Sequence, residues 1–409
     1  MIRTRLPSLP NGSALRVCKS STSSPVFGSS RYTTHHVRFG STQADIQASR
    51  VQVEVTQNRK PRPDPATLSF GKVFTDHMLT IPWKASSGWG APQIHPYRPF
   101  TLDPSVGVFH YAQCLFEGLK AYRDETGKVT LFRPDMNMKR MNISAQRIAL
   151  PAFNGDEVTE LLKQLIRLDK DWIPNVPGYS LYIRPTMIGC QPAIGISPPS
   201  EALLFVICSP VGPYYPEGFN RRAAPGGVGA YKLGANYAPG LVAQKEAAKK
   251  GYVQNLWLYG PEHQVTEVGT MNAFAVFKRP DGTIEIATPP LDGMILPGVT
   301  RDSVLNIARD HIAGKYKIAD LPDKLAVSER QMTMREVKEA AQAGNLVEFF
   351  GTGTAAVISP VDRIGYLGED IHIPTGPDGM GPISRPIWQQ LVGIQTGTIQ
   401  HPWSVVVME

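Results

Sequence analysis

One lysine lies in a stretch of small residues where its amine could act as a nucleophile. The segment Gly226–Gly240 reads GGVGAYKLGANYAPG, and Tyr237 follows Lys232 by five residues. Packing against small residues can remove water from a lysine, which lowers its pKa from about 10.4 and leaves a neutral amine able to form a Schiff base. Alone, such a segment is more often a solvated loop. It matches neither the P-loop nor the G-x-G-x-x-G pattern, because Lys232 stands where the latter needs its last glycine.

A carboxylate forms the second candidate, within QVTEVGTMN (Gln264–Asn272). Glu267 lies among valine and glycine at the entrance to the apolar run AFAVF, where a buried acid needs a cationic partner. Next to a pyridine nitrogen, an ionised Glu267 would keep that nitrogen protonated and make the ring an electron sink. The alternative is a surface residue at the edge of a strand.

Two tight turns are candidate anion sites. ILPGVTRDSV (Ile295–Val304) precedes a predicted helix, and FFGTGTAAV (Phe349–Val357) joins two predicted strands. Free backbone N–H groups at a helix N-terminus or in a turn bind phosphate or carboxylate. Arg140, on a predicted helix, could supply a fixed charge opposite a phosphate. An ordinary helix cap, an ordinary hairpin turn and a solvated arginine are the alternatives.

These residues must be positioned by alternating strands and helices. Apolar and β-branched runs predict strands within 68–83, at 180–188, 202–208, 254–259, 270–278 and 283–288, and in LVEFF and VISPV. Helical spacing predicts helices from Pro134 to 150, at 155–172, 300–311 and 333–343, and from about 386. Four prolines and four glycines in 209–227 predict a connection between two domains of an α/β or α+β fold.

Composition narrows the class of protein. With 42% hydrophobic and 19% charged residues, the 409-residue chain has the profile of a globular protein and not of a disordered one. No run approaches the roughly 18 apolar residues that a transmembrane helix needs, so we expect a soluble protein. Four scattered cysteines predict neither a disulfide framework nor a metal site.

The net charge of +7 belongs to the N-terminal segment. No acid precedes Asp45, and removing the six basic residues before it leaves 36 basic against 35 acidic residues. Arginine, serine and threonine without acids are typical of a mitochondrial transit peptide, so we expect residues 1–44 to be a disordered matrix presequence. An uncleaved extension without a targeting role and a basic nucleic-acid-binding arm are the alternatives.

Together these segments resemble one family. FEGLKAY (Phe116–Tyr122), LFRPDMNMKRM, LYIRPTMIG, YKLGANYAP, EVGTMN, LPGVTR and FGTGTA occur in the order and spacing of branched-chain amino acid aminotransferases. These are fold-type IV enzymes that depend on pyridoxal 5'-phosphate (PLP), with the fold of D-amino acid aminotransferase. The resemblance covers residues 65–405. It implies a small α/β domain at 45–208, a connection at 209–227 and a larger PLP-binding domain at 228–409.

The resemblance also implies roles for single residues. Lys232 resembles the catalytic lysine that bonds to PLP and moves the proton. The remaining cofactor contacts would come from Arg140, Tyr237, Glu267, Thr270, Val299, Thr300 and Thr354. The substrate would meet Tyr111, Phe116, Tyr182, Arg184 and the Thr354 and Ala355 amides.

The activity implied is transfer of the amino group of Leu, Ile or Val to 2-oxoglutarate, by a homodimer in the mitochondrial matrix that binds no metal, nucleic acid or membrane. A D-amino acid aminotransferase and an aminodeoxychorismate lyase would use a similar lysine and glutamate, and a non-catalytic anion- or RNA-binding protein is the alternative from another class.

The sequence departs from the family pattern at one place. Mammalian members that resemble this chain carry a C-x-x-C pair where Ala356 and Ser359 stand here, so a thiol switch is not expected.

Overall fold

The computed structural model describes residues 44–212, 226–376 and 379–409. The expected presequence and most of the expected connection at 209–227 therefore lie outside the described residues; only Ser209–Val211 of that range belong to a strand. Gln43–Glu409 form one unit of the chain. Among the described helices, none combines the length and the apolar character that crossing a bilayer requires.

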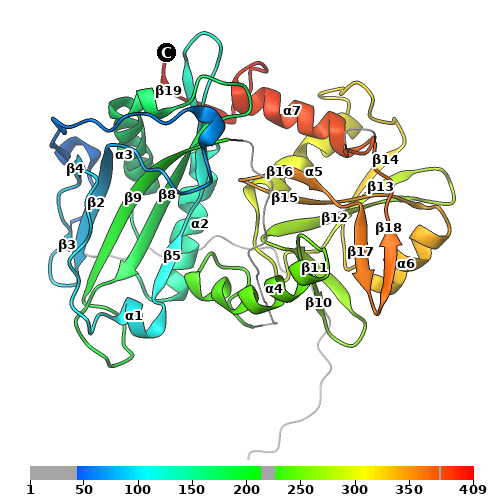
Figure 1. Ribbon diagram of the computed structural model, residues 1–409, viewed down its shortest axis with the longest axis horizontal. Helices are drawn as coiled ribbons and strands as arrows, with labels where there is room; N and C mark the ends of the chain where they lie inside the picture. The colour runs from blue at the N-terminus through cyan, green and yellow to red at the C-terminus, as the bar shows by residue number, and fades with distance from the viewer. Residues whose placement is uncertain (1–43, 213–225, 377–378) are drawn as a thin grey trace, which may run out of the picture. The chain divides into compact units, whose positions relative to one another are not determined.

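The first of two large sheets is built mainly from the N-terminal half of the chain (Figure 1). Its strand order is β1-β4-β2-β9-β8-β6-β7-β19, with β3 beside β2 and β5 beside β8. All of these pairs are antiparallel except β1 with β4. The strands are β1 Gln52–Val53, β2 His77–Lys84, β3 Gly88–Trp89, β4 Gln93–Pro96, β5 Cys114–Phe116, β6 Leu119–Arg123, β7 Val129–Phe132, β8 Ser180–Gly189, β9 Glu201–Val211 and β19 Ser404–Met408.

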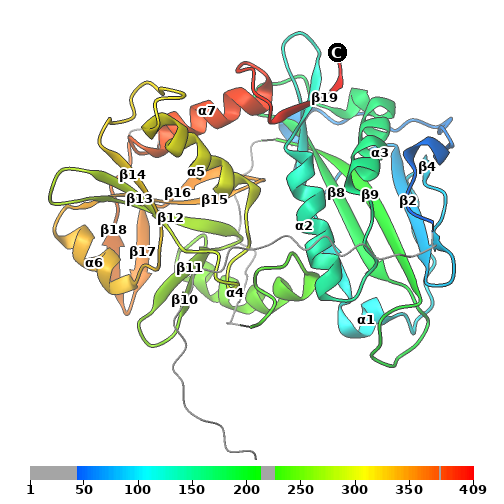
Figure 2. The same cartoon turned by 180° about the vertical axis from the view of Figure 1, so that it is seen from behind.

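Helices α2 (Pro134–Arg147) and α3 (Gly155–Leu168) cover one face of this sheet (Figure 2). Proline at the first position begins α2, where its missing N–H costs nothing. Asn154 caps α3 by accepting from the N–H groups of Asp156 and Glu157. The buried side chains of α3 recur at helical spacing, which fixes the face turned to the core. A short helix, α1 (Gly107–Tyr111), precedes β5.

The second sheet follows the order β10-β11-β12-β13-β14, and β15 and β16 extend it from the other side of β12. The strands are β10 Leu256–Tyr259, β11 Gln264–Val268, β12 Met271–Lys278, β13 Ile284–Thr288, β14 Leu325–Glu329, β15 Leu346–Gly353 and β16 Val357–Pro360. Seven of the eight residues of β12 are buried, because apolar clusters lie on both faces of the strand.

Helices α5 (Val299–Ile312) and α7 (Ser384–Thr396) pack on one face, and α6 (Met334–Gln342) packs on the other with the hairpin β17 (Arg363–Tyr366) and β18 (Glu369–His372). Helix α4 (Leu241–Lys249) precedes β10. Thr333 caps α6, because its hydroxyl accepts from the N–H of Glu336. In a capping box the Glu336 carboxylate would accept from the Thr333 N–H, but here it accepts from Arg330.

The last strand departs from the simple division into two consecutive domains. Although β19 lies in the range 228–409, it pairs antiparallel with β7 and closes one edge of the first sheet. Arg167 of α3 also donates to the carbonyl of Val407 at 2.8 Å. The chain therefore crosses between the two sheets a second time.

Candidate active site

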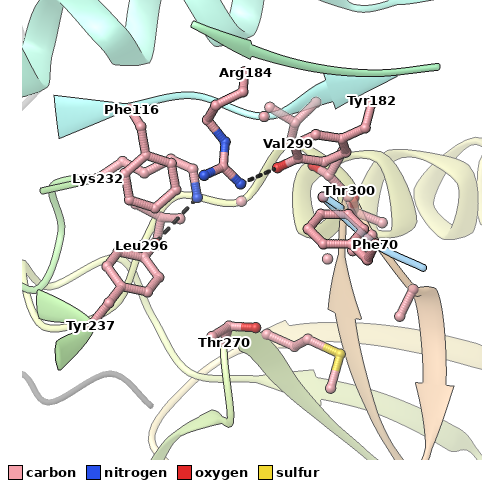
Figure 3. A pocket seen from close by; sticks show the side chains of 18 of the residues that line it. Phe70, Phe116, Tyr182, Arg184, Lys232, Tyr237, Thr270, Leu296, Val299 and Thr300 are labelled. Atoms are coloured by element: carbon pink, nitrogen blue, oxygen red, sulfur yellow. Dashed lines mark hydrogen bonds between the residues drawn. The ribbon is translucent and has the colours of Figure 1, made fainter. Parts of the chain in front are cut away.

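A cavity of about 540 Å³ is lined by residues of both sheets and their connections (Figure 3). Eleven of the thirteen predicted site residues line it, and the two that do not are Glu267 and Tyr111. The eleven are Phe116, Arg140, Tyr182, Arg184, Lys232, Tyr237, Thr270, Val299, Thr300, Thr354 and Ala355.

Lys232 enters the cavity between two aromatic rings. Its backbone is tied to the first sheet, because the N–H of Phe116 donates to the Lys232 carbonyl and the Lys232 N–H donates to Ser144 Oγ. The side-chain amine lies 3.2 Å from Tyr237 Oη and 4.6 Å from the centre of the Phe116 ring, as Figure 3 shows. The amine is thus held beside a hydroxyl and under an aromatic face.

Arg140 reaches the cavity from α2 and is fixed by a buried acid. Its Nε and Nη2 each donate to a different oxygen of Glu117 at 2.7 Å, and its Nη1 donates to the Pro297 carbonyl at 3.1 Å. Glu117 is fully buried and also accepts from Asn137 Nδ2 at 2.8 Å. Burial alone would raise the pKa of Glu117, but the charge and hydrogen bonds of Arg140 hold that pKa below its usual value. The guanidinium is therefore locked in one orientation.

Glu267 lies directly behind the wall. The carboxylate, on β11, is 3% exposed. Its Oε1 accepts from the Leu296 N–H at 3.1 Å and from Asn272 Nδ2 at 3.3 Å, and both donors belong to residues that line the cavity. A side chain at Gly298 would overlap Asn272 Oδ1, so glycine is required there. The acid is thereby linked to the loop that leads into α5.

Two segments that line the cavity are candidate anion sites. Val299 and Thr300 form the first turn of α5, whose aligned N–H groups favour a negative charge. The other segment is the turn Thr354–Ala356 between β15 and β16. Both segments belong to the second sheet and its helices.

The first sheet supplies the opposite wall. Arg184 Nη2 donates to Tyr182 Oη at 3.1 Å, and the Arg184 guanidinium lies 4.6 Å from the centre of the Phe116 ring (Figure 3). Phe70 packs against Tyr182 with ring centres 4.8 Å apart. A side chain at Gly118 would overlap the Tyr182 hydroxyl. The wall combines aromatic surface with one cation.

Tyr111 lies apart from the other predicted residues. It ends α1, is 44% exposed and donates its hydroxyl hydrogen to the Ile194 carbonyl. Within this chain it forms no part of the cavity wall.

Three buried polar side chains beside the cavity are absent from the sequence-based prediction. Glu117, Asn137 and Asn272 hold Arg140 and Glu267 in place. Glu117 carries a signal, since it is the only acid in the otherwise apolar and basic FEGLKAY. The two asparagines carry none, because their partners lie 20 and 5 residues away and depend on the fold.

The donor set fits PLP. An amine lies beside a phenol, a buried carboxylate lies behind the loop at Leu296, and an arginine with helix N-terminal amides offers a site for a phosphate. The cavity volume of about 540 Å³ lies within the range of about 300–1,000 Å³ that small-molecule and cofactor sites occupy.

Comparison with known proteins gives consistent matches. The family model described as amino-transferase class IV matches residues 114–364. The cytosolic branched-chain-amino-acid aminotransferase of Saccharomyces cerevisiae is 52% identical over 90% of this chain and 99% of that protein. The mitochondrial enzyme of the same yeast is 51% identical over 91% and 96%. The T.th. branched-chain amino acid aminotransferase, solved with N-(5'-phosphopyridoxyl)-L-glutamate, is 25% identical and superposes with a TM-score of 0.58 over 80% of this chain and 98% of that one.

Proposed function

The chain belongs to the branched-chain-amino-acid aminotransferases of class IV, and from this membership we propose how its residues carry the reaction. It transfers the amino group of a branched-chain amino acid to a 2-oxo acid and depends on PLP. The observation that carries the residue assignments is the contact of Lys232 Nζ with Tyr237 Oη in a cavity walled by both sheets.

PLP supplies an aldehyde that bonds to amines and a ring that withdraws electrons from the substrate α-carbon. Lys232 would provide the amine that bonds to the cofactor and, when free, the base that removes the α-proton of the substrate. Glu267 would hold a proton on the ring nitrogen, and Asn272 and the Leu296 N–H fix its carboxylate. Tyr237 would donate to the phenolic oxygen of the ring.

Arg140, Val299, Thr300 and Thr354 would hold the phosphate of the cofactor. Arg140 offers it a charge that Glu117 keeps in one orientation, and Val299 and Thr300 offer backbone amides. The Thr354 hydroxyl completes this site, and Thr270 lies beside the cofactor and substrate.

Residues of the first sheet and of the turn between β15 and β16 would bind the substrate. Phe116 and Tyr182 provide the apolar surface that suits an aliphatic side chain, and the amides of Thr354 and Ala355 receive the carboxylate. Arg184 provides a cation on the same wall, which accommodates a second, acidic oxo acid. We assign 2-oxoglutarate as that acceptor.

The finer assignments rest on the resemblance and on composition. We propose a homodimer and a matrix location directed by the acid-free segment 1–44. The matched yeast relatives include a cytosolic and a mitochondrial enzyme, and the composition of this chain's own segment 1–44 is what favours the matrix.

Absorbance spectroscopy tests the proposal. We expect the purified protein to show a visible band that L-leucine, added without an oxo acid, converts to a near-ultraviolet band. Lys232→Ala should remain folded and lose transamination, whereas Lys249→Ala, at an exposed lysine of α4, should behave as wild type. A band that only a D-amino acid bleaches would contradict the substrate assignment, and turnover by Lys232→Ala would contradict the role of the lysine.

A further inference from the structure

A second lysine, Lys120, is buried close to the cavity and has no part in the reaction described above. It lies on β6 of the first sheet and is 7% exposed. Its Nζ donates to the Ala355 carbonyl at 2.8 Å, in the turn between β15 and β16 of the second sheet. Lys120, Thr300 and Thr354 also line a small second cavity, and the two threonines line the main cavity. Lys120 therefore lies behind the wall of the main cavity, next to two residues of that wall.

No acid of the described residues forms an ion pair with Lys120, and burial lowers the pKa of its amine to about 8. A buried ammonium without a carboxylate is costly, because the Coulomb attraction that usually offsets desolvation is missing. Arg140, the other buried cation near the cavity, has Glu117 for this purpose. The Lys120 ammonium would therefore be stabilised by an anion that does not belong to the protein.

The turn that Lys120 holds is strained. Val357, which ends it, has a φ of 61°, a conformation that a β-branched residue adopts only when its surroundings enforce it. All described peptide bonds are trans, so a carbonyl and the N–H of the same peptide group point in opposite directions. With the Ala355 carbonyl turned to Lys120, the Ala356 N–H points away from Lys120. A flip of this peptide would reverse both groups.

We propose that Lys120 is a positioning residue for the α-carboxylate of both substrates, a proposal that rests on the function proposed above. Its hydrogen bond keeps the Ala355 carbonyl from facing the incoming carboxylate, so the Ala356 N–H of the same peptide group faces the carboxylate beside the Thr354 and Ala355 amides. Its positive charge, which lies behind the wall of the main cavity, balances the carboxylate once that group is bound. Because the amino acid and the 2-oxo acid share this carboxylate, Lys120 serves both half-reactions.

The test uses 4-methylvaleric acid, which has the carbon skeleton of leucine and no amine. Calorimetric titration of the holoenzyme with this acid and with the neutral 4-methylvaleramide separates carboxylate recognition from apolar contact. We expect Lys120→Met to weaken binding of the acid about tenfold or more and to change binding of the amide less than about twofold. Lys84→Met, at an exposed lysine on β2 of the same sheet, should change neither.

Kinetics provide a second readout. In Lys120→Met, KM for leucine and KM for the oxo acid should both rise about tenfold, while kcat changes less. Methionine fills a similar apolar volume, and Lys120→Gln, which keeps a polar head, takes its place in both experiments if the first variant does not fold. Equal loss of acid and amide binding would mean that Lys120 only supports the fold, and unchanged acid binding would overturn the proposal outright.

The affinity of the apoenzyme for PLP shows which anion Lys120 balances, the phosphate of the cofactor or the carboxylate of the substrate. If Lys120→Met weakens PLP binding and leaves 4-methylvaleric acid binding intact, the phosphate is the counterion and the proposal is wrong. If wild type neither takes up PLP nor turns over leucine, the proposed function fails before Lys120 is tested.

Discussion

Removing the Glu117 charge should destabilise the apoenzyme through Arg140. In Glu117→Gln the side-chain shape is kept, but the guanidinium loses the carboxylate that accepts from both Nε and Nη2 at 2.7 Å. The two side chains are 0% and 8% exposed, so water cannot replace the lost partner. Breaking a buried pair by removing one partner costs about 3–5 kcal/mol.

That cost converts to a shift in melting temperature. Unfolding entropy of about 2.1 cal/mol/K per residue, over the roughly 370 residues of Gln43–Glu409, gives about 0.8 kcal/mol/K, so Glu117→Gln should melt about 4–6 °C below wild type. Differential scanning calorimetry of the apoenzyme measures this shift. Addition of PLP should recover part of it, because the phosphate supplies Arg140 with a new negative partner.

A double-mutant cycle isolates the pair from general damage to the core. Arg140→Met alone leaves the Glu117 carboxylate buried without its cation, while the double variant leaves neither charge unpaired. The melting temperature of the double variant should therefore fall by much less than the sum of the decreases in the two single variants. Strictly additive losses, or a drop of less than about 1 °C in Glu117→Gln, would refute the reasoning.

Two further predictions concern stability away from the cavity. Burial alone would raise the pKa of Glu285, but hydrogen bonds led by that from Arg330 lower it to about 2. The stability that this group contributes is therefore present above about pH 4.5 and is lost as the pH falls towards 2. Across this range the melting temperature should fall more steeply for wild type than for Glu285→Gln, and parallel curves would exclude the Glu285–Arg330 pair as the cause. The Glu348 carboxylate accepts from the N–H groups of Ile383 and Ser384 at the start of α7, so Glu348→Gln should lose about 1–2 kcal/mol in urea unfolding, and no loss would show that α7 does not depend on this cap.

Sequence patterns predicted the elements whose signals are local. The periodic apolar residues of α3 lie within the helix they specify, and the observed helix begins at the expected Gly155. It ends at Leu168, before the expected residue 172, and a short 3-10 helix follows at Lys170–Trp172. Lys232 and Tyr237 are five residues apart, and the 3-10 helix Gly234–Asn236 between them brings their side chains together. The resemblance to the family then gave the remaining site residues, and their roles stay proposals.

Contacts between distant segments could not be predicted from the sequence. The Lys120 amine meets a carbonyl 235 residues later, and no local pattern marks either group. The strand β19 is absent from the predicted strands, and nothing in its valines specifies β7 as the partner. The positive φ of Val357 opposes local preference, and only tertiary contacts enforce it.

Because β19 pairs with β7, one edge of the first sheet stays unpaired until the end of the chain has been synthesised. Roughly 270 residues separate Phe132 from Ser404, and at about 5–20 residues per second their synthesis takes roughly a quarter of a minute to a minute. During that time the outer edge of β7 has donors and acceptors without their final partner. An open strand edge is where nascent chains associate wrongly, so this edge exposes the growing chain to wrong pairing until Ser404–Met408 has been made.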